Sequence, residues 1–482
     1  MQRSKRKNQW GLFIIYGYMV LPIVIFMFGW LRWYYALLFG GLILAAYVRS
    51  VVSDTVNVIN VFLKKDRKLW LAVFGISMLW VLLAGIGGYC FQNYDHLYRN
   101  AIFHTLVDYD WPVISQDGSR ALIYYIGFWL PAACVGKLFN LEAGYMFQVF
   151  WAVLGILIVY GLICVYRRKA DMLPLVFMIF FSGLDYVGTW LVNTGMGYLD
   201  LSTAAHLEWW AGVQFSSTTT QLFWVFNQAL PAWLGVMFIL VQKKCSNMFF
   251  ILSLIMLTST FPFVGLIPIV LVLCFEKVRK GESSWKELAT FQNIVGIVVI
   301  GGVSFLYLVG NLSGEKIGQT DEVVTLRQLI PIVLRDAVFF YLEAGIYLQF
   351  VCLYRKKDML LKVLVLILVI CPFIKVGNGG DFCMRVSIPA LFILMVFGIE
   401  TLERLYMEQR KRLLSLYCVI LLIGAITPFN EIHRTIQETI LKAGHVQNQR
   451  SEIALETELL QYENFSGVLD GNIFFQYFTK DR

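Results

Sequence analysis

The sequence predicts an all-α polytopic membrane protein, a bundle of about 13 membrane helices. Of its 482 residues, 58% are hydrophobic and only 15% are charged, and the mean hydropathy is +0.66. A soluble protein rarely has this composition. The apolar runs are continuous rather than alternating, which favours helices over a β-barrel. The lipid bilayer is therefore the first expected partner.

About eleven apolar runs are long enough to be taken as full crossings. In chain order they are Trp10–Gly29, Trp33–Val48, Leu69–Gly88, Gly144–Tyr166, Pro174–Val192, Leu222–Val241, Phe291–Gly310, Leu329–Tyr354, Leu360–Val376, Val386–Tyr406 and Leu413–Phe429. Basic clusters follow many of them, and such clusters favour the cytoplasmic side.

Two further runs are interpreted differently. Ala121–Phe139 contains Pro131 and is expected to be a shallow or re-entrant helix, because a full crossing would place the RRK that follows Tyr166 outside. Met248–Phe275 has basic residues near both ends and is interrupted by FPFVG. It is expected to be a hairpin of two short helices that enters from the cytoplasm.

This order predicts a cell-membrane protein with a cytoplasmic N-terminus, a membrane domain over residues 1–429 and an external tail over 430–482. The net charge of +8 comes mostly from basic residues beside the spans, so no nucleic-acid partner is expected. The nine cysteines show no CxxC or metal spacing and are expected to act as small hydrophobes.

The first large external loop, residues 89–142, is expected to carry interfacial helices and the main candidate site. Its segment Gln92–Val113 reads as a helix whose polar stripe, His96, Asn100, His104 and Asp108, faces a water-filled cavity. Asp95 and Arg99 form an i,i+4 pair beside the stripe. Asp95 is a candidate general base, and Arg99 would keep it ionised or bind a phosphate. An ordinary surface ion pair is the alternative.

His96, His104 and Asp108 have spacing that would also allow a divalent metal ion on one helix face, without an HExxH pattern. A polar interfacial stripe explains the same residues, so no cofactor is expected.

Other candidates for substrate binding are expected at the same outer level. Asp185 is a carboxylate within a span, which marks it as functional or as a helix-to-helix hydrogen bond. Trp209 and Trp210 suit an interface belt or a sugar path. Arg335 and Arg385 are placed to contact an anionic group, with internal pairing or snorkelling as the alternatives.

The segments NYDHLYRNAIF, YYIGFWLPAACVGKLF, FFSGLDYVG, WVFNQALPAWL and NGGDFCMRVSIPAL resemble bacterial polytopic membrane glycosyltransferases of the GT-C fold. That resemblance implies a polyprenyl-phosphate-linked sugar donor and a catalytic acid in the first large external loop, here Asp95. The adjacent second acid of the family is replaced by His96, and more than one span precedes the loop, whereas the simplest members of the family have one.

The resulting hypothesis is transfer of a sugar to a cell-envelope glycan, lipid or protein at the outer face. Two alternatives are a polymerase or ligase of lipid-linked glycans, which relies on external arginines, and a non-enzymatic transporter or flippase of a lipid-linked glycan. The transferase hypothesis requires the ionisable side chains to converge in one outward-facing pocket, whereas the transporter predicts polar residues that continue through the membrane to the cytoplasmic face.

Overall fold

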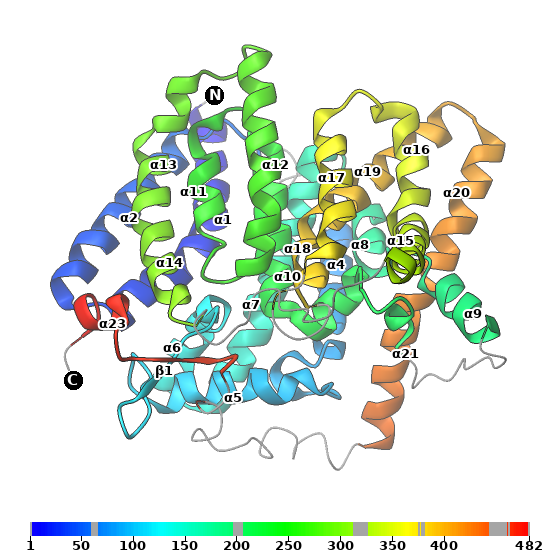
Figure 1. Cartoon of the computed structure of the whole chain (residues 1–482). Helices are drawn as coiled ribbons and strands as arrows, with labels where there is room; N and C mark the ends of the chain where they lie inside the picture. The colour runs from blue at the N-terminus through cyan, green and yellow to red at the C-terminus, as the bar shows by residue number, and fades with distance from the viewer. Residues whose placement is uncertain are drawn as a thin grey trace.

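The computed structural model describes residues 2–58, 66–195, 206–311, 326–374, 376, 381–442, 460 and 463–480. These residues form a bundle of helices with one two-stranded sheet, β1–β2 (Figure 1). Nine helices of the described chain are long and apolar enough to cross a membrane. The predicted helical membrane class is therefore supported, and the number of about eleven crossings stays a prediction.

The first half of the chain contains α1 (Gln2–Trp30), α2 (Trp33–Ser53), α4 (Arg67–Leu83), α5 (Asp95–Asp108), β1 (Arg120–Leu122), α6 (Leu130–Leu138), α7 (Leu141–Arg167), α8 (Leu173–Phe180), α9 (Asp185–Gly195) and α10 (Thr218–Val241). The second half contains α11 (Met248–Ser253), α12 (Thr260–Arg279), α13 (Phe291–Val295), α14 (Gly302–Val309), α15 (Leu326–Phe340), α16 (Ile346–Arg355), α17 (Met359–Ile370), α18 (Asp381–Val386), α19 (Ile388–Met407), α20 (Lys411–Gly424), α21 (Ile426–Leu441), β2 (Ser466–Val468) and α23 (Ile473–Tyr477).

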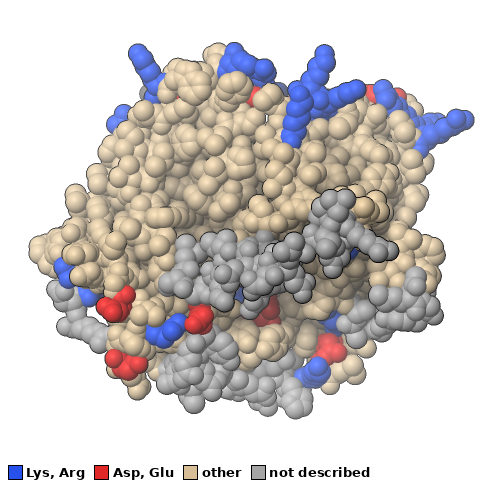
Figure 2. All heavy atoms as spheres, in the orientation of Figure 1, with Lys and Arg blue, Asp and Glu red and all other residues tan. Residues whose placement is uncertain are grey.

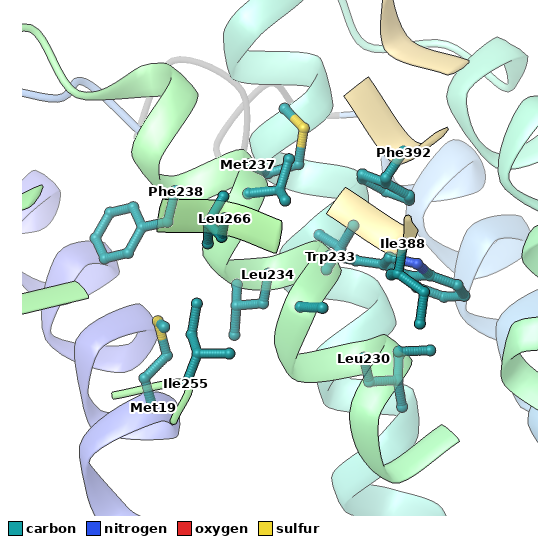
Figure 3. Packing of buried hydrophobic residues seen from close by; sticks show 14 of the residues in the cluster. Met19, Leu230, Trp233, Leu234, Met237, Phe238, Ile255, Leu266, Ile388 and Phe392 are labelled. Carbon is teal, nitrogen blue, oxygen red and sulfur yellow. The ribbon is translucent and has the colours of Figure 1, made fainter. Parts of the chain in front are cut away.

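Helix α10 is the centre of the bundle and packs against α7, α8, α11, α12, α19 and α21. Its apolar side chains, among them Trp233 and Leu234, meet residues of α1, α12 and α19 in one continuous core (Figure 3). Trp233 stacks on Phe392 of α19 at 5.3 Å and on Trp80 of α4 at 6.1 Å between ring centroids. Because α10 is buried on all sides, the polar residues near its start must bond within the protein.

Charge divides the molecule into three layers. Lys and Arg crowd one edge, acidic and basic residues mix near the opposite edge, and the face between them is almost uncharged (Figure 2). This pattern is what a membrane-spanning bundle requires, since charged groups are costly in hydrocarbon. The basic edge is expected to be cytoplasmic.

The structure refines several expected elements. Residues 121–139 do not cross: they form part of β1, a turn and the nine-residue α6, which Pro131 begins rather than bends. The expected hairpin breaks between α11 and α12 rather than at FPFVG, which lies inside α12. Its second arm has 20 residues, so it is not short.

The C-terminal segment packs on the membrane domain. Helix α21 runs through the predicted boundary at residue 429, so residues 430–441 continue a helix rather than begin a tail. Beyond it, β2 pairs antiparallel with β1, with Ala121 opposite Gly467. Helix α23 packs on α14, and Lys480 N donates to Trp30 O. The described part of the tail therefore covers the loop that carries β1.

Candidate active site

A glycine turn delivers the first site residues. Gly85 and Gly87 have φ of 77° and 81°, a region that glycine adopts without strain, and they end α4 sharply. The Gln92 side chain donates to Gly85 O at 2.8 Å and so holds the turn closed. Asn93 then accepts from the backbone N–H of Asp95 at 3.1 Å. The local sequence thus places Asp95 in the first turn of α5, where the helix dipole favours an acid.

The polar stripe of α5 is buried at its first two residues, His96 and Asn100, which corrects the expectation that they face a water-filled cavity, whereas His104 is half-buried and Asp108 is exposed. His96 is 1% exposed, with Nε2 3.1 Å from Phe223 O. Burial, together with the charge of the neighbouring arginine, lowers the pKa of His96 to about 3, so the ring is neutral at physiological pH. Asn100 is also buried, and His104 Nε2 lies 2.8 Å from Tyr145 Oη. The two histidines therefore support packing.

Asp95 and Arg99 form the expected ion pair, 3.0 Å between Oδ2 and Nη2. The Asp95 side chain is 36% exposed and that of Arg99 only 9%. Arg99 Nε donates to Asn227 Oδ1 at 3.4 Å, and its guanidinium lies 5.9 Å from the Phe226 ring centroid. Within the described residues Arg99 Nη1 is buried without an acceptor. A buried, incompletely bonded guanidinium is suited to an anion.

Arg385 approaches the same region from α18. Its Nη1 donates to Tyr125 Oη at 3.0 Å, its Nη2 lies 3.1 Å from Asp381 Oδ2, and its guanidinium is 5.8 Å from the Phe261 ring centroid. Arg385 Nε is also buried without an acceptor in the described part of the chain. The side chain is 12% exposed, while that of Asp381 is 51% exposed. A second N–H group is thus left for an anionic ligand.

The Asp95–Arg99 ion pair and Arg385 interact electrostatically. Burial raises the pKa of the Asp95 carboxyl group, but the charge and hydrogen bond of Arg99, with the charge of Arg385, hold it below its usual range. The charges of both arginines also act on the Tyr124 hydroxyl. Arg385, far away in sequence, therefore acts on the same carboxyl group as Arg99.

Aromatic rings form a continuous wall beside these charges. Tyr94 and Tyr98 lie 5.7 Å apart between centroids, Phe465 of the tail stacks on Tyr98 at 5.5 Å, and Tyr124 meets Phe465 at 5.0 Å. Tyr124 Oη donates to Tyr125 Oη, which connects the wall to Arg385. The tail therefore contributes to the site, because the β1–β2 pairing fixes Phe465.

A second group of polar residues, the acid cluster, lies elsewhere in the bundle. It comprises Asp185, His206, Glu208, Glu343 and Glu431. Burial, reinforced by the charge of Asp185, raises the pKa of Glu208 to about 7. Burial lowers the pKa of His206, but its hydrogen bond to Glu431, 2.9 Å from Nδ1 to Oε1, and nearby negative charge raise it overall. Glu208 is therefore partly protonated near neutral pH.

Asp185 begins α9, after a break in the run predicted as one span. Its Oδ2 accepts from Ser182 at 2.9 Å and from Thr427 at 3.1 Å. Its other oxygen and Glu343 Oε2 are both buried without a hydrogen-bond donor in the described chain. A cavity of about 10 Å³, lined in part by Ser182 and Glu343, lies beside them. The structure thus groups Asp185 with the acid cluster, not with Asp95.

The remaining predicted residues also lie with the acid cluster. Trp210 Nε1 donates to Glu343 Oε1 at 3.2 Å. Trp209 is 60% exposed. Arg335 is 45% exposed, and its Nη2 lies 2.8 Å from Asp336 Oδ1. Of the predicted substrate-binding residues, Arg99, His96 and Arg385 thus lie near Asp95 in the described chain, and His96 is neutral there.

In the part of the chain that the structure describes, no group of three or more His, Cys, Asp or Glu side chains is arranged to hold a metal ion. No protein-family model, curated protein or solved structure matches this chain. The function of this protein is therefore inferred from the chemistry of its two polar regions, the one around Asp95 and the acid cluster.

Sequence reasoning did not assign Tyr125, Asn227, Asp381 or Phe465 to the site. Asn227 had a signal, because an amide in an apolar run requires a partner. Asp381 also had a sequence signal, because it precedes Arg385 by four residues and the two can form an i,i+4 ion pair on a helix. Tyr125 and Phe465 have no local pattern that distinguishes them from packing aromatics.

Proposed function

We propose that this protein is a membrane glycosyltransferase of the cell envelope that uses a polyprenyl-phosphate-linked sugar. The observation that supports this most is the pair of buried arginines, Arg99 and Arg385, each with an N–H group that has no acceptor in the described chain, beside the ionised Asp95. A phosphate group supplies the missing acceptors. The polyprenyl group of such a donor is apolar and suits the lipid bilayer beside the protein.

In this mechanism Asp95 accepts the proton of the attacking hydroxyl group on a glycan, lipid or protein acceptor. Arg99 and Arg385 stabilise the negative charge that develops on the departing phosphate, and both are already in place before the reaction. The lowered pKa of Asp95 keeps it in the basic form at neutral pH.

The experiment separates donor binding from transfer. Purified protein in lipid nanodiscs is tested for binding of a polyprenyl monophosphate, and for transfer with a panel of polyprenyl-phosphate sugars by release of the lipid phosphate. Asp95→Asn is expected to bind the lipid but lose transfer by a factor of about 10² or more. Arg99→Ala and Arg385→Ala are expected to lose binding.

Arg335→Ala is the matched control, because Arg335 is exposed and paired with Asp336. Unchanged lipid binding in both Arg99→Ala and Arg385→Ala, or normal transfer in Asp95→Asn, would contradict the mechanism.

One observation favours the glycan polymerase or ligase as a second candidate. Asp95 is already paired with Arg99 at 3.0 Å, which weakens it as a base. A reaction that relies on the arginines alone predicts that Arg385→Ala abolishes transfer while Asp95→Asn does not.

A further inference from the structure

Two cysteines lie beside the site. Cys371 follows α17 and Cys383 lies in α18, two residues before Arg385. Their Sγ atoms are 3.7 Å apart, and each residue is 2% exposed. A disulfide bond is about 2.05 Å long, so the sulfur atoms need to approach by less than about 2 Å.

A second cysteine pair lies toward the basic edge and provides an internal comparison. Cys245 Sγ lies 3.9 Å from Cys274 O, and the two thiols are within hydrogen-bonding range. Lys277 acts on this pair electrostatically, and basic residues precede it in the chain. Under the orientation proposed here, this pair faces the reducing cytoplasm, whereas Cys371 and Cys383 lie toward the external, oxidising side.

We propose that Cys371 and Cys383 form a disulfide that ties the end of α17 to α18. Two S–H bonds break and one S–S bond forms. The two protons and two electrons pass to an external disulfide such as oxidised glutathione, whose own S–S bond is cleaved to two thiols. Because both residues are 2% exposed, this exchange requires local opening of α18, and reduction of the bond once formed requires the same opening.

The bond has a consequence for the proposed donor site. Helix α18 has only six residues and carries both Asp381 and Arg385. A covalent link at Cys383 restricts movement of this short helix, and a restricted Arg385 loses less freedom when it binds an anion. This consequence rests on the proposed function, whereas the bond itself depends only on the cysteine geometry and the orientation.

The test uses the wild-type protein in native membranes. The membranes are incubated with oxidised glutathione, free thiols are blocked with N-ethylmaleimide in denaturant, and the digest is analysed by mass spectrometry. We expect a peptide cross-linked through Cys371 and Cys383, and two of the nine thiols protected from labelling, while Cys245 and Cys274 stay labelled. Labelling of all nine thiols, or a cross-link between Cys245 and Cys274 instead, would overturn the proposal.

One variant tests the specificity of the bond, and a comparison of the oxidised and reduced wild type tests its consequence. In Cys371→Ser, the cross-linked peptide is expected to disappear; a cross-link from Cys383 to any other cysteine would contradict the assigned pair. With polyprenyl monophosphate as the probe, the oxidised wild type is expected to bind more tightly than the reduced form. Equal affinity of the two forms would show that the bond does not influence lipid binding through Arg385. Absence of lipid binding in both forms would count against the proposed function. Neither result changes the interpretation of the cross-linked peptide.

Discussion

Individual residues in this protein are charged in places where charge is costly. Arg99 and Arg385 are mostly buried and each has one N–H group without an acceptor in the described chain, so the ligand-free site is held at some free-energy cost. Asp95 avoids this cost through its ion pair and partial exposure. His96, next to it in sequence, is instead neutral and serves packing. Adjacent residues therefore have different roles because their environments differ.

Glu208 gives a prediction for pH dependence. Its pKa rises from 4.5 to about 7 in the folded protein, so its protonated form contributes stability fully below about pH 4.5, and this contribution is lost as pH rises through 7. We expect the thermal midpoint of the wild type to fall between pH 6 and pH 8, and Glu208→Gln to reduce the slope, as measured by differential scanning fluorimetry in detergent at about equal ionic strength.

Glu282→Gln is the control, because Glu282 lies on an exposed loop and is 52% exposed. An unchanged slope in Glu208→Gln would show that other groups dominate the pH dependence.

At the level of elements, close helix approach positions the site. A Cβ atom on Gly265 of α12 would lie 2.1 Å from Val386 O, so only glycine lets α12 meet the end of α18 at this distance. The same approach places Phe261 beside Arg385. The FPFVG motif, interpreted from sequence as a break, is therefore a packing contact that supports the anion site.

Gly265→Ala tests this contact. The added methyl group must push α18 away, and overpacking of this kind costs about 1–3 kcal/mol. We expect a lower thermal midpoint and weaker binding of polyprenyl monophosphate. The matched control is Gly75→Ala in α4, where a Cβ atom meets nothing within 4 Å. Equal behaviour of the two variants would mean that α12 does not support Arg385.

The whole molecule separates two polar regions within one bundle. One contains Asp95, Arg99 and Arg385 and is covered by the tail, and the other is the acid cluster. Basic residues crowd the opposite edge (Figure 2). In the proposed mechanism the first region binds an anion, and the basic edge predicts the direction in which the protein is inserted.

Orientation is tested by labelling introduced cysteines in intact cells. With Cys352, which is exposed, replaced by Ser, Asp470→Cys in the tail is expected to react with a membrane-impermeant maleimide. Glu282→Cys near the basic edge is expected to react only after permeabilisation. The reverse pattern would place the site in the cytoplasm and would exclude an external transferase.

The sequence by itself determined the helical membrane class, most apolar segments, the non-crossing nature of residues 121–139 and the Asp95–Arg99 pair. These follow from local rules: hydrophobic length, basic flanks and i,i+4 spacing act within one segment. Only the tertiary structure decided that Arg385 joins Asp95, that Asp185 and Trp210 join the acid cluster, and that Phe465 of the tail completes the aromatic wall. The physical reason is that packing between distant helices selects which face of each is buried, and no local pattern encodes that choice.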